Sequence, residues 1–100
     1  MAYIYHLTTR QEWEASLTMG SHTVPSLKEE GFIHCCTEEQ IAQVVDRFYK
    51  DAMDIVILKV NTEKLRSQLV YEWSSSMEDT YPHVYGAINT DSVEDVSDMY

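Results

Sequence analysis

Hydrophobic and polar positions near the start of the chain change from a strand-like to a helix-like pattern. The segment Tyr3–Thr8 is rich in β-branched and aromatic residues, which predicts a short strand. Thr9 and Glu12 have the spacing of a helix capping box, and Trp13 and Leu17 lie one helical turn apart. We therefore predict a helix over roughly residues 10–19.

The capping-box spacing occurs twice more. Ser26 and Glu29 have it, but Gly31 follows so closely that only about one helical turn fits. Thr37 and Gln40 also have it, and the hydrophobic residues behind them recur at i, i+3, i+4 and i+7. These residues are Ile41, Val44, Val45 and Phe48. Their pattern predicts an amphipathic helix whose apolar face packs on the core.

Short apolar runs predict the remaining strands. Phe32–Cys36 is predicted as an inner strand, and Ile55–Val60 is apolar enough to be covered on both faces. Three later segments have a similar β-rich composition: Leu69–Trp73, Tyr81–Tyr85 and Val93–Met99. Ser74–Thr80 is polar and predicts a surface loop, and Gly86–Asp91 predicts a turn.

Strands outnumber helices in this pattern, and the helices lie in the first half of the chain. We therefore predict the α+β class, with residues 1–100 as a single domain. The expected architecture is a mixed or antiparallel sheet of about five or six strands with two or three short helices.

Charge narrows the class of partner. The chain has 17 acidic and 7 basic residues and a net charge of −10, and residues 67–100 contain no Lys or Arg. Binding to nucleic acid and to anionic membranes requires cations, so we expect neither partner. A small nucleotide-like ligand is the expected partner, and the sequence does not set the oligomeric state.

The ends and the cysteines suggest the compartment. No apolar run approaches the length of about 18–20 residues that spans a bilayer, and the start lacks the pattern of a secretory signal. Cys35 and Cys36 are neighbours, which is unfavourable for a disulfide between them. We expect a cytoplasmic protein.

Three histidines lie in or beside short strands and are the candidate catalytic residues. His6 precedes the helix predicted to be capped by Thr9, and His34 precedes the helix predicted to be capped by Thr37. Such strand ends present side chains and helix N–H groups to one cleft, which favours a ligand with hydroxyl and phosphate groups. His83 lies two residues before Tyr85, so both side chains share one face of a strand.

Other interpretations of these residues stay open. A single histidine on a strand is often a hydrogen-bonded structural group, and His22 in its loop is expected to be solvated. Cys36, just before a helix, is either a nucleophile with a lowered pKa or a buried apolar residue. His34 and Cys36 share a strand face, so a His-based metal site is a further alternative, although we expect no metal because the spacing is unusual for zinc.

The chain resembles, over nearly its whole length, a family of small bacterial proteins catalogued as domain of unknown function 952. The residues that carry the resemblance are Tyr5-His6-Leu7-Thr8-Thr9 with Trp13, Gly31-Phe32-Ile33-His34-Cys35, Arg47-Phe48-Tyr49, the strand Ile55–Val60, Tyr71-Glu72 and Pro82-His83-Val84-Tyr85-Gly86.

More distantly, the order of motifs is similar to the ADP-ribosyltransferase fold, in particular to NAD-dependent RNA 2′-phosphotransferases. The resemblance implies that His6 and Thr8 form the first motif, which contacts a ribose, and that His34 belongs to the second. For the third position His83, Tyr85 and Glu72 compete. Those enzymes usually have Gly where this chain has Leu7, whose side chain would block the nicotinamide.

Two functions follow as hypotheses. In the first, a cleft lined by His6, His34 and His83 binds a nucleotide related to NAD or ADP-ribose and catalyses ADP-ribosyl or a related group transfer. Further ligand-binding residues are then Thr8, Thr9, Thr37, Glu72 and Tyr85. In the second, the same cleft binds a small ligand without catalysis.

Overall fold

The computed structural model describes residues 2–99. Its helices are α1 (Arg10–Met19), α2 (Pro25–Glu30) and α3 (Ile41–Phe48), with two short 3₁₀ helices, η1 (Glu38–Gln40) and η2 (Thr90–Ser92). Its strands are β1 (Tyr3–Thr9), β2 (Ser21–His22), β3 (Ile33–His34), β4 (Ile55–Asn61), β5 (Gln68–Ser74), β6 (Asp79–Tyr85), β7 (Ile88–Asn89) and β8 (Val93–Asp98).

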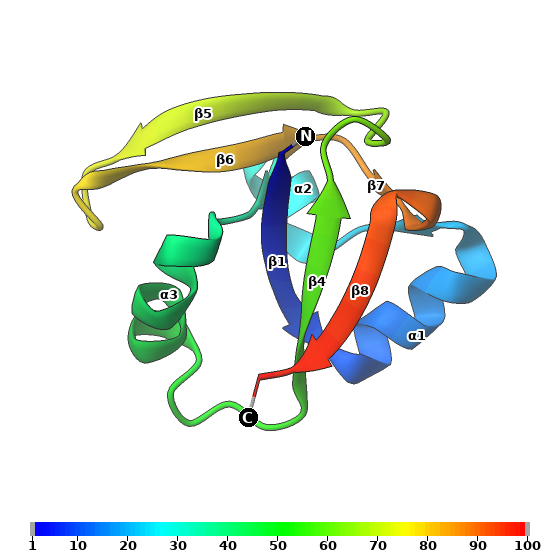
Figure 1. Cartoon of the computed structure of the whole chain (residues 1–100), viewed down its shortest axis with the longest axis horizontal. Helices are drawn as coiled ribbons and strands as arrows, with labels where there is room; N and C mark the ends of the chain where they lie inside the picture. The colour runs from blue at the N-terminus through cyan, green and yellow to red at the C-terminus, as the bar shows by residue number, and fades with distance from the viewer. Residues whose placement is uncertain (1, 100) are drawn as a thin grey trace.

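The strands form three small antiparallel sheets, with orders β1-β4-β8, β2-β7 and β3-β6-β5. Figure 1 shows the first sheet in the middle of the molecule, with α1 and α3 on opposite sides of it and the β5–β6 hairpin across one end. The α+β class and antiparallel pairing are confirmed. The single sheet of five or six strands is wrong, because the chain divides its pairing among three sheets.

The central sheet is held by β4, which lies between β1 and β8. Its side chains alternate between two apolar clusters: Leu58 and Val60 pack on the α1 side with Ile4, and Ile55 packs on the α3 side with Leu7. Burial on both faces, as predicted, explains why β4 is an almost continuous apolar run.

Helix starts follow local chemistry. The capping box of Thr9 and Glu12 is present, and α1 has the predicted bounds. The box of Thr37 and Gln40 is also present, but it begins η1, and α3 follows. The predicted box at Ser26 is wrong: α2 begins at Pro25, whose fixed φ suits the first helical position and needs no side-chain cap.

The segment around His34 differs most from its prediction. Only Ile33–His34 forms a strand, and it lies at the edge of its sheet instead of inside it. Beyond it the chain leaves β6 and Cys36 pairs with Tyr5 of β1 through two backbone hydrogen bonds of 2.7 and 2.8 Å. One short segment therefore connects two sheets and closes part of the otherwise unpaired edge of β1.

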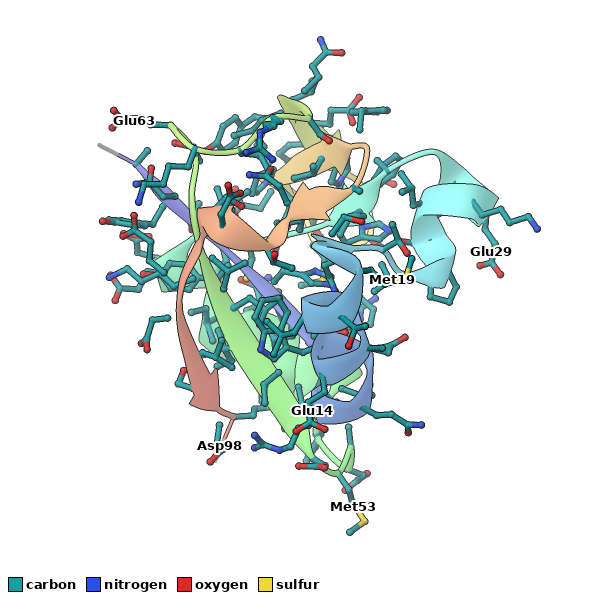
Figure 2. The ribbon with its side chains drawn as sticks, turned by 90° about the vertical axis from the view of Figure 1, so that its right-hand side faces the viewer. Glu14, Met19, Glu29, Met53, Glu63 and Asp98 are labelled. Carbon is teal, nitrogen blue, oxygen red and sulfur yellow. The ribbon has the colours of Figure 1, made fainter. Side chains whose placement is uncertain are left out.

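Smaller differences occur in the second half. The predicted loop over residues 74–80 is shorter, because β5 and β6 extend into it, and the predicted turn contains β7 and η2. Acidic side chains project outward, as Figure 2 shows for Glu29 and Asp98. Among the described residues, no helix is long and apolar enough to cross a membrane.

Candidate functional site

A cavity of about 720 Å³ lies beside β1, and all three candidate histidines line it. Its walls come from β1, the start of α2, the β3–η1 segment, α3 and the end of the β5–β6 hairpin. His6 and Leu7 point to opposite faces of β1 and both contribute. The cavity therefore extends around the free edge of β1.

His6 is buried between β1 and β3. Its Nδ1 lies 2.7 Å from the carbonyl oxygen of His34, which only accepts hydrogen bonds, so Nδ1 carries the proton. Burial lowers the pKa of His6 to about 4, and His22 beside it acts in the same direction. At neutral pH the ring is uncharged, with the lone pair on Nε2. That atom is sealed from solvent and has no hydrogen-bond partner.

His22 is the neighbour that the sequence did not reveal. It is fully buried in β2, and its ring meets the His6 ring edge-on at 5.2 Å between centroids. Ser16 donates to the carbonyl of Glu12 and so accepts from Nδ1 of His22, at 2.5 Å. The expectation of a solvated His22 is wrong, because the pairing of β2 with β7 buries it and no local pattern announces that contact.

His34 is exposed and lies opposite His83. The two residues pair in the β3–β6 register, and their rings meet edge-on at 5.3 Å. Nε2 of His34 lies 3.0 Å from a carboxylate oxygen of Glu30. Phe32 packs against both histidines and stacks on the His83 ring at 4.1 Å. Phe32 was not predicted as a site residue, although its spacing of two from His34 places both on one face.

The three residues that competed for the third position form one hydrogen-bonded group. Oε1 of Glu72 lies 2.7 Å from Nδ1 of His83 and accepts from the hydroxyl of Tyr85 at 2.5 Å. These two hydrogen bonds, Tyr85 first, lower the pKa of Glu72, and the bond to Glu72 raises the pKa of Tyr85. Sequence separation hid this arrangement, because Glu72 lies on β5 and the other two residues on β6.

The partner of His83 sets its chemistry. An ionised carboxylate only accepts, so Nδ1 of His83 donates to Glu72 and the lone pair of the neutral ring lies on Nε2. The His83 side chain is only 10% exposed, but it lines the cavity. A carboxylate that orients a histidine beside a cavity is an arrangement suited to a general base.

The predicted threonines serve the helix starts. The hydroxyls of Thr8 and Thr9 donate to Oε1 of Glu12 at 2.8 and 3.1 Å, and Thr37 caps η1. Thr8 and Thr9 line the cavity together with Glu12, whereas Thr37 does not. The N-terminus of α1 thus already has a carboxylate, which differs from the expected open phosphate site.

Leu7 forms part of the cavity wall without standing free in it. Its side chain is 5% exposed and packs in one cluster with Cys36, Ile55 and Tyr81. The hydroxyl of Tyr49 donates to the carbonyl of Leu7 at 3.3 Å. The side chain is therefore fixed on the α3 face of β1, and the carbonyl of Leu7 already has a hydrogen-bond partner.

Burial and distance describe the cysteines and the residues of the metal alternative. Cys35 and Cys36 are buried free thiols, and burial raises the pKa of both, that of Cys36 to about 12. The interpretation of Cys36 as a nucleophile with a lowered pKa is therefore wrong. Among residues 2–99 no three His, Cys, Asp or Glu side chains lie close enough to hold a metal ion. His34 faces Glu30 in solvent, whereas Cys36 is buried near β1.

Comparison with known proteins identifies the family. The family model described as protein of unknown function (DUF952) matches residues 7–96. The chain belongs to this family. No curated protein matches the chain.

Solved structures of protein CC0527 from Caulobacter crescentus are similar throughout. Its crystal structure has 26% sequence identity to this chain and a TM-score of 0.87, covering 97% of this chain and 85% of that chain. A solution NMR structure of CC0527 has 27% identity and a TM-score of 0.81, covering 98% and 84%. The fold is thus that of a DUF952 protein, and the names of these structures state no activity.

Proposed function

We propose that the cavity binds a ribosyl compound related to NAD or ADP-ribose and that the protein transfers the ribosyl-containing group to an acceptor. The proposal includes a distant relationship to the ADP-ribosyltransferase fold, which the order of His6, Thr8, a capped helix and His34 supports. The observation that carries it is the contact of Glu72 with His83, whose side chain lines the cavity.

The proposed reaction assigns a step to each group. Nε2 of His83 takes the proton from a hydroxyl or water, whose oxygen attacks the anomeric carbon of the ribosyl group. The bond from that carbon to the ring nitrogen of the base breaks, and its electron pair leaves with the base. Glu72 keeps the imidazole in the reactive tautomer and balances the charge that the proton brings.

The test is incubation of the protein with NAD, with nicotinamide riboside and with ADP-ribose, followed by nicotinamide release and thermal shift. Release from at least one of the two nicotinamide compounds is expected, and His83→Gln or Glu72→Gln is expected to reduce it about a hundredfold or more while the thermal shift remains. Glu29→Gln is the control, because Glu29 is exposed on α2 and Figure 2 shows it pointing away from the fold. The absence of both nicotinamide release and a thermal shift with all three compounds would refute the proposal.

A binding module without catalysis is the second candidate. The observations that favour it are the sealed Nε2 of His6 and the occupied carbonyl of Leu7, because a ribosyl compound gains few polar contacts on that side. A thermal shift without nicotinamide release is its expected result. Release that disappears in His83→Gln would exclude it.

A further inference from the structure

The cavity has the wrong charge for phosphate. Among the described residues that line it there is no Lys or Arg, and Glu12 is its one carboxylate. Burial raises the pKa of Glu12, but hydrogen bonds from Thr8 and Thr9 outweigh this effect and lower it overall. Glu12 is therefore ionised at neutral pH. A phosphate in this cavity would meet a negative group without a compensating cation.

The N-terminal end of α1 does not offset this charge, because its own side chains already bond there. Thr9 accepts from the backbone N–H of Glu12, and the Glu12 carboxylate receives the hydroxyls of Thr8 and Thr9. The N-terminal end of α1 is thus neutralised by its own side chains, and an anion would have to displace them.

Two exposed aromatic side chains line the cavity. Trp73 of β5 is 65% exposed and Phe48 of α3 is 60% exposed, and both line the cavity, whereas Trp13 is buried in the core. Figure 1 shows the end of the β5–β6 hairpin and α3 on the same side of the central sheet. Exposed aromatic side chains beside a cavity are suited to stack a planar ring.

We propose that the ligand is a nucleoside without a phosphate group. Its neutral or cationic base lies against Trp73 and Phe48, and its ribosyl group lies toward His83. This inference rests on the proposed function and narrows its substrate to nucleosides such as nicotinamide riboside. A pyridinium base also fits the reaction, because it leaves as a neutral ring and needs no proton.

The matched probes are nicotinamide riboside and nicotinamide mononucleotide, which differ by one phosphate. Isothermal titration is expected to show that the riboside binds at least about tenfold more tightly than the mononucleotide. Glu12→Gln is expected to reduce the difference by strengthening binding of the mononucleotide. Glu14→Gln is the control on the same helix, since Glu14 is exposed and lies outside the cavity lining.

Contact of the base with Trp73 and Phe48 can be measured separately. Riboside binding is expected to quench the fluorescence of Trp73, and Trp73→Phe removes the quench but keeps the affinity. Trp73→Ala and Phe48→Ala each weaken binding about tenfold. Tyr71→Ala is the control, because Tyr71 is an exposed aromatic residue of β5 outside the cavity lining.

The outcomes separate the two proposals. If the mononucleotide binds as tightly as the riboside or more tightly, this inference is overturned while the proposed function stands. If the riboside is preferred but Trp73→Ala binds it normally, the placement of the base is overturned. If neither compound, nor NAD, nor ADP-ribose binds, the proposed function fails as well.

Discussion

Two histidines of this protein have opposite surroundings, and their chemistry differs accordingly. His6 is removed from solvent and has a carbonyl partner, so its ring stays neutral and its Nε2 is sealed. His83 has a carboxylate partner, and its side chain lines the cavity. The residue type is the same in both motifs, and only the neighbours distinguish a buried structural group from a candidate base.

Burial of His6 predicts a pH-dependent stability. The unfolded chain takes up a proton at this histidine below about pH 6.5, whereas the folded protein resists protonation down to a pKa of about 4. The contribution of His6 to the free energy of unfolding is complete above about pH 6.5 and is lost as the pH falls toward the folded-state pKa of about 4. The free energy of unfolding is expected to fall by about 3 kcal/mol over this range, measured by urea denaturation.

His6→Gln is the comparison for this effect, because its amide can donate to the same carbonyl but does not titrate. Between pH 6.5 and 5, the free energy of unfolding of His6→Gln is expected to decrease less than that of the wild type. A residual slope is expected from His22, because burial lowers its pKa as well. Equal slopes in the two proteins would contradict the assignment.

At the scale of the element, the start of α1 connects fold and site. Thr9 caps the helix, and the Glu12 carboxylate accepts a hydrogen bond from the backbone N–H of Thr9. The same carboxylate sets the charge of the cavity. The capping box was predictable from spacing alone because it involves residues only three positions apart. Its effect on the cavity was not, because that depends on what lies across from the helix.

Removal of the cap is expected to destabilise the protein. Thr9→Ala removes the side-chain acceptor for the backbone N–H of Glu12 and is expected to lower the free energy of unfolding by about 1 kcal/mol. Thr18→Ala, at an exposed position of the same helix, is expected to leave it unchanged or raise it slightly. Denaturant unfolding measures both, and a Thr9→Ala protein as stable as the wild type would refute the role of the cap.

At the scale of the whole molecule, the cavity exists because separate elements are held apart and fixed. Gln40, at the end of η1, is buried and donates to the side chain of Asp79 and to the carbonyl of Thr80, each at 2.9 Å. These bonds connect the start of α3 to the β5–β6 hairpin. The hairpin residues at the cavity entrance are positioned through them.

Loss of this connection is expected to loosen the hairpin. Gln40→Ala leaves the carbonyl of Thr80 without its side-chain donor and is expected to cost about 1–3 kcal/mol of stability. The specific sign is that the substitution accelerates amide hydrogen exchange in β6 more than in β4. Gln43→Ala, an exposed position of α3, is the control. Uniform exchange changes across the molecule would contradict a local role.

The sequence by itself determined the local structure of this protein. The extents of α1 and β4, the α+β class and two of the three capping boxes follow from spacing and apolar periodicity, because the interactions that decide them join near neighbours. The three histidine motifs were recognisable for the same reason.

Tertiary structure decided the rest. The division into three sheets, the burial of His22 beside His6 and the joining of Glu72 to His83 depend on segments far apart in the chain. The pKa values follow from these contacts, since desolvation and hydrogen bonding arise only when distant segments meet. The charge of the cavity is likewise set by which side chains line it, and composition reports only their total.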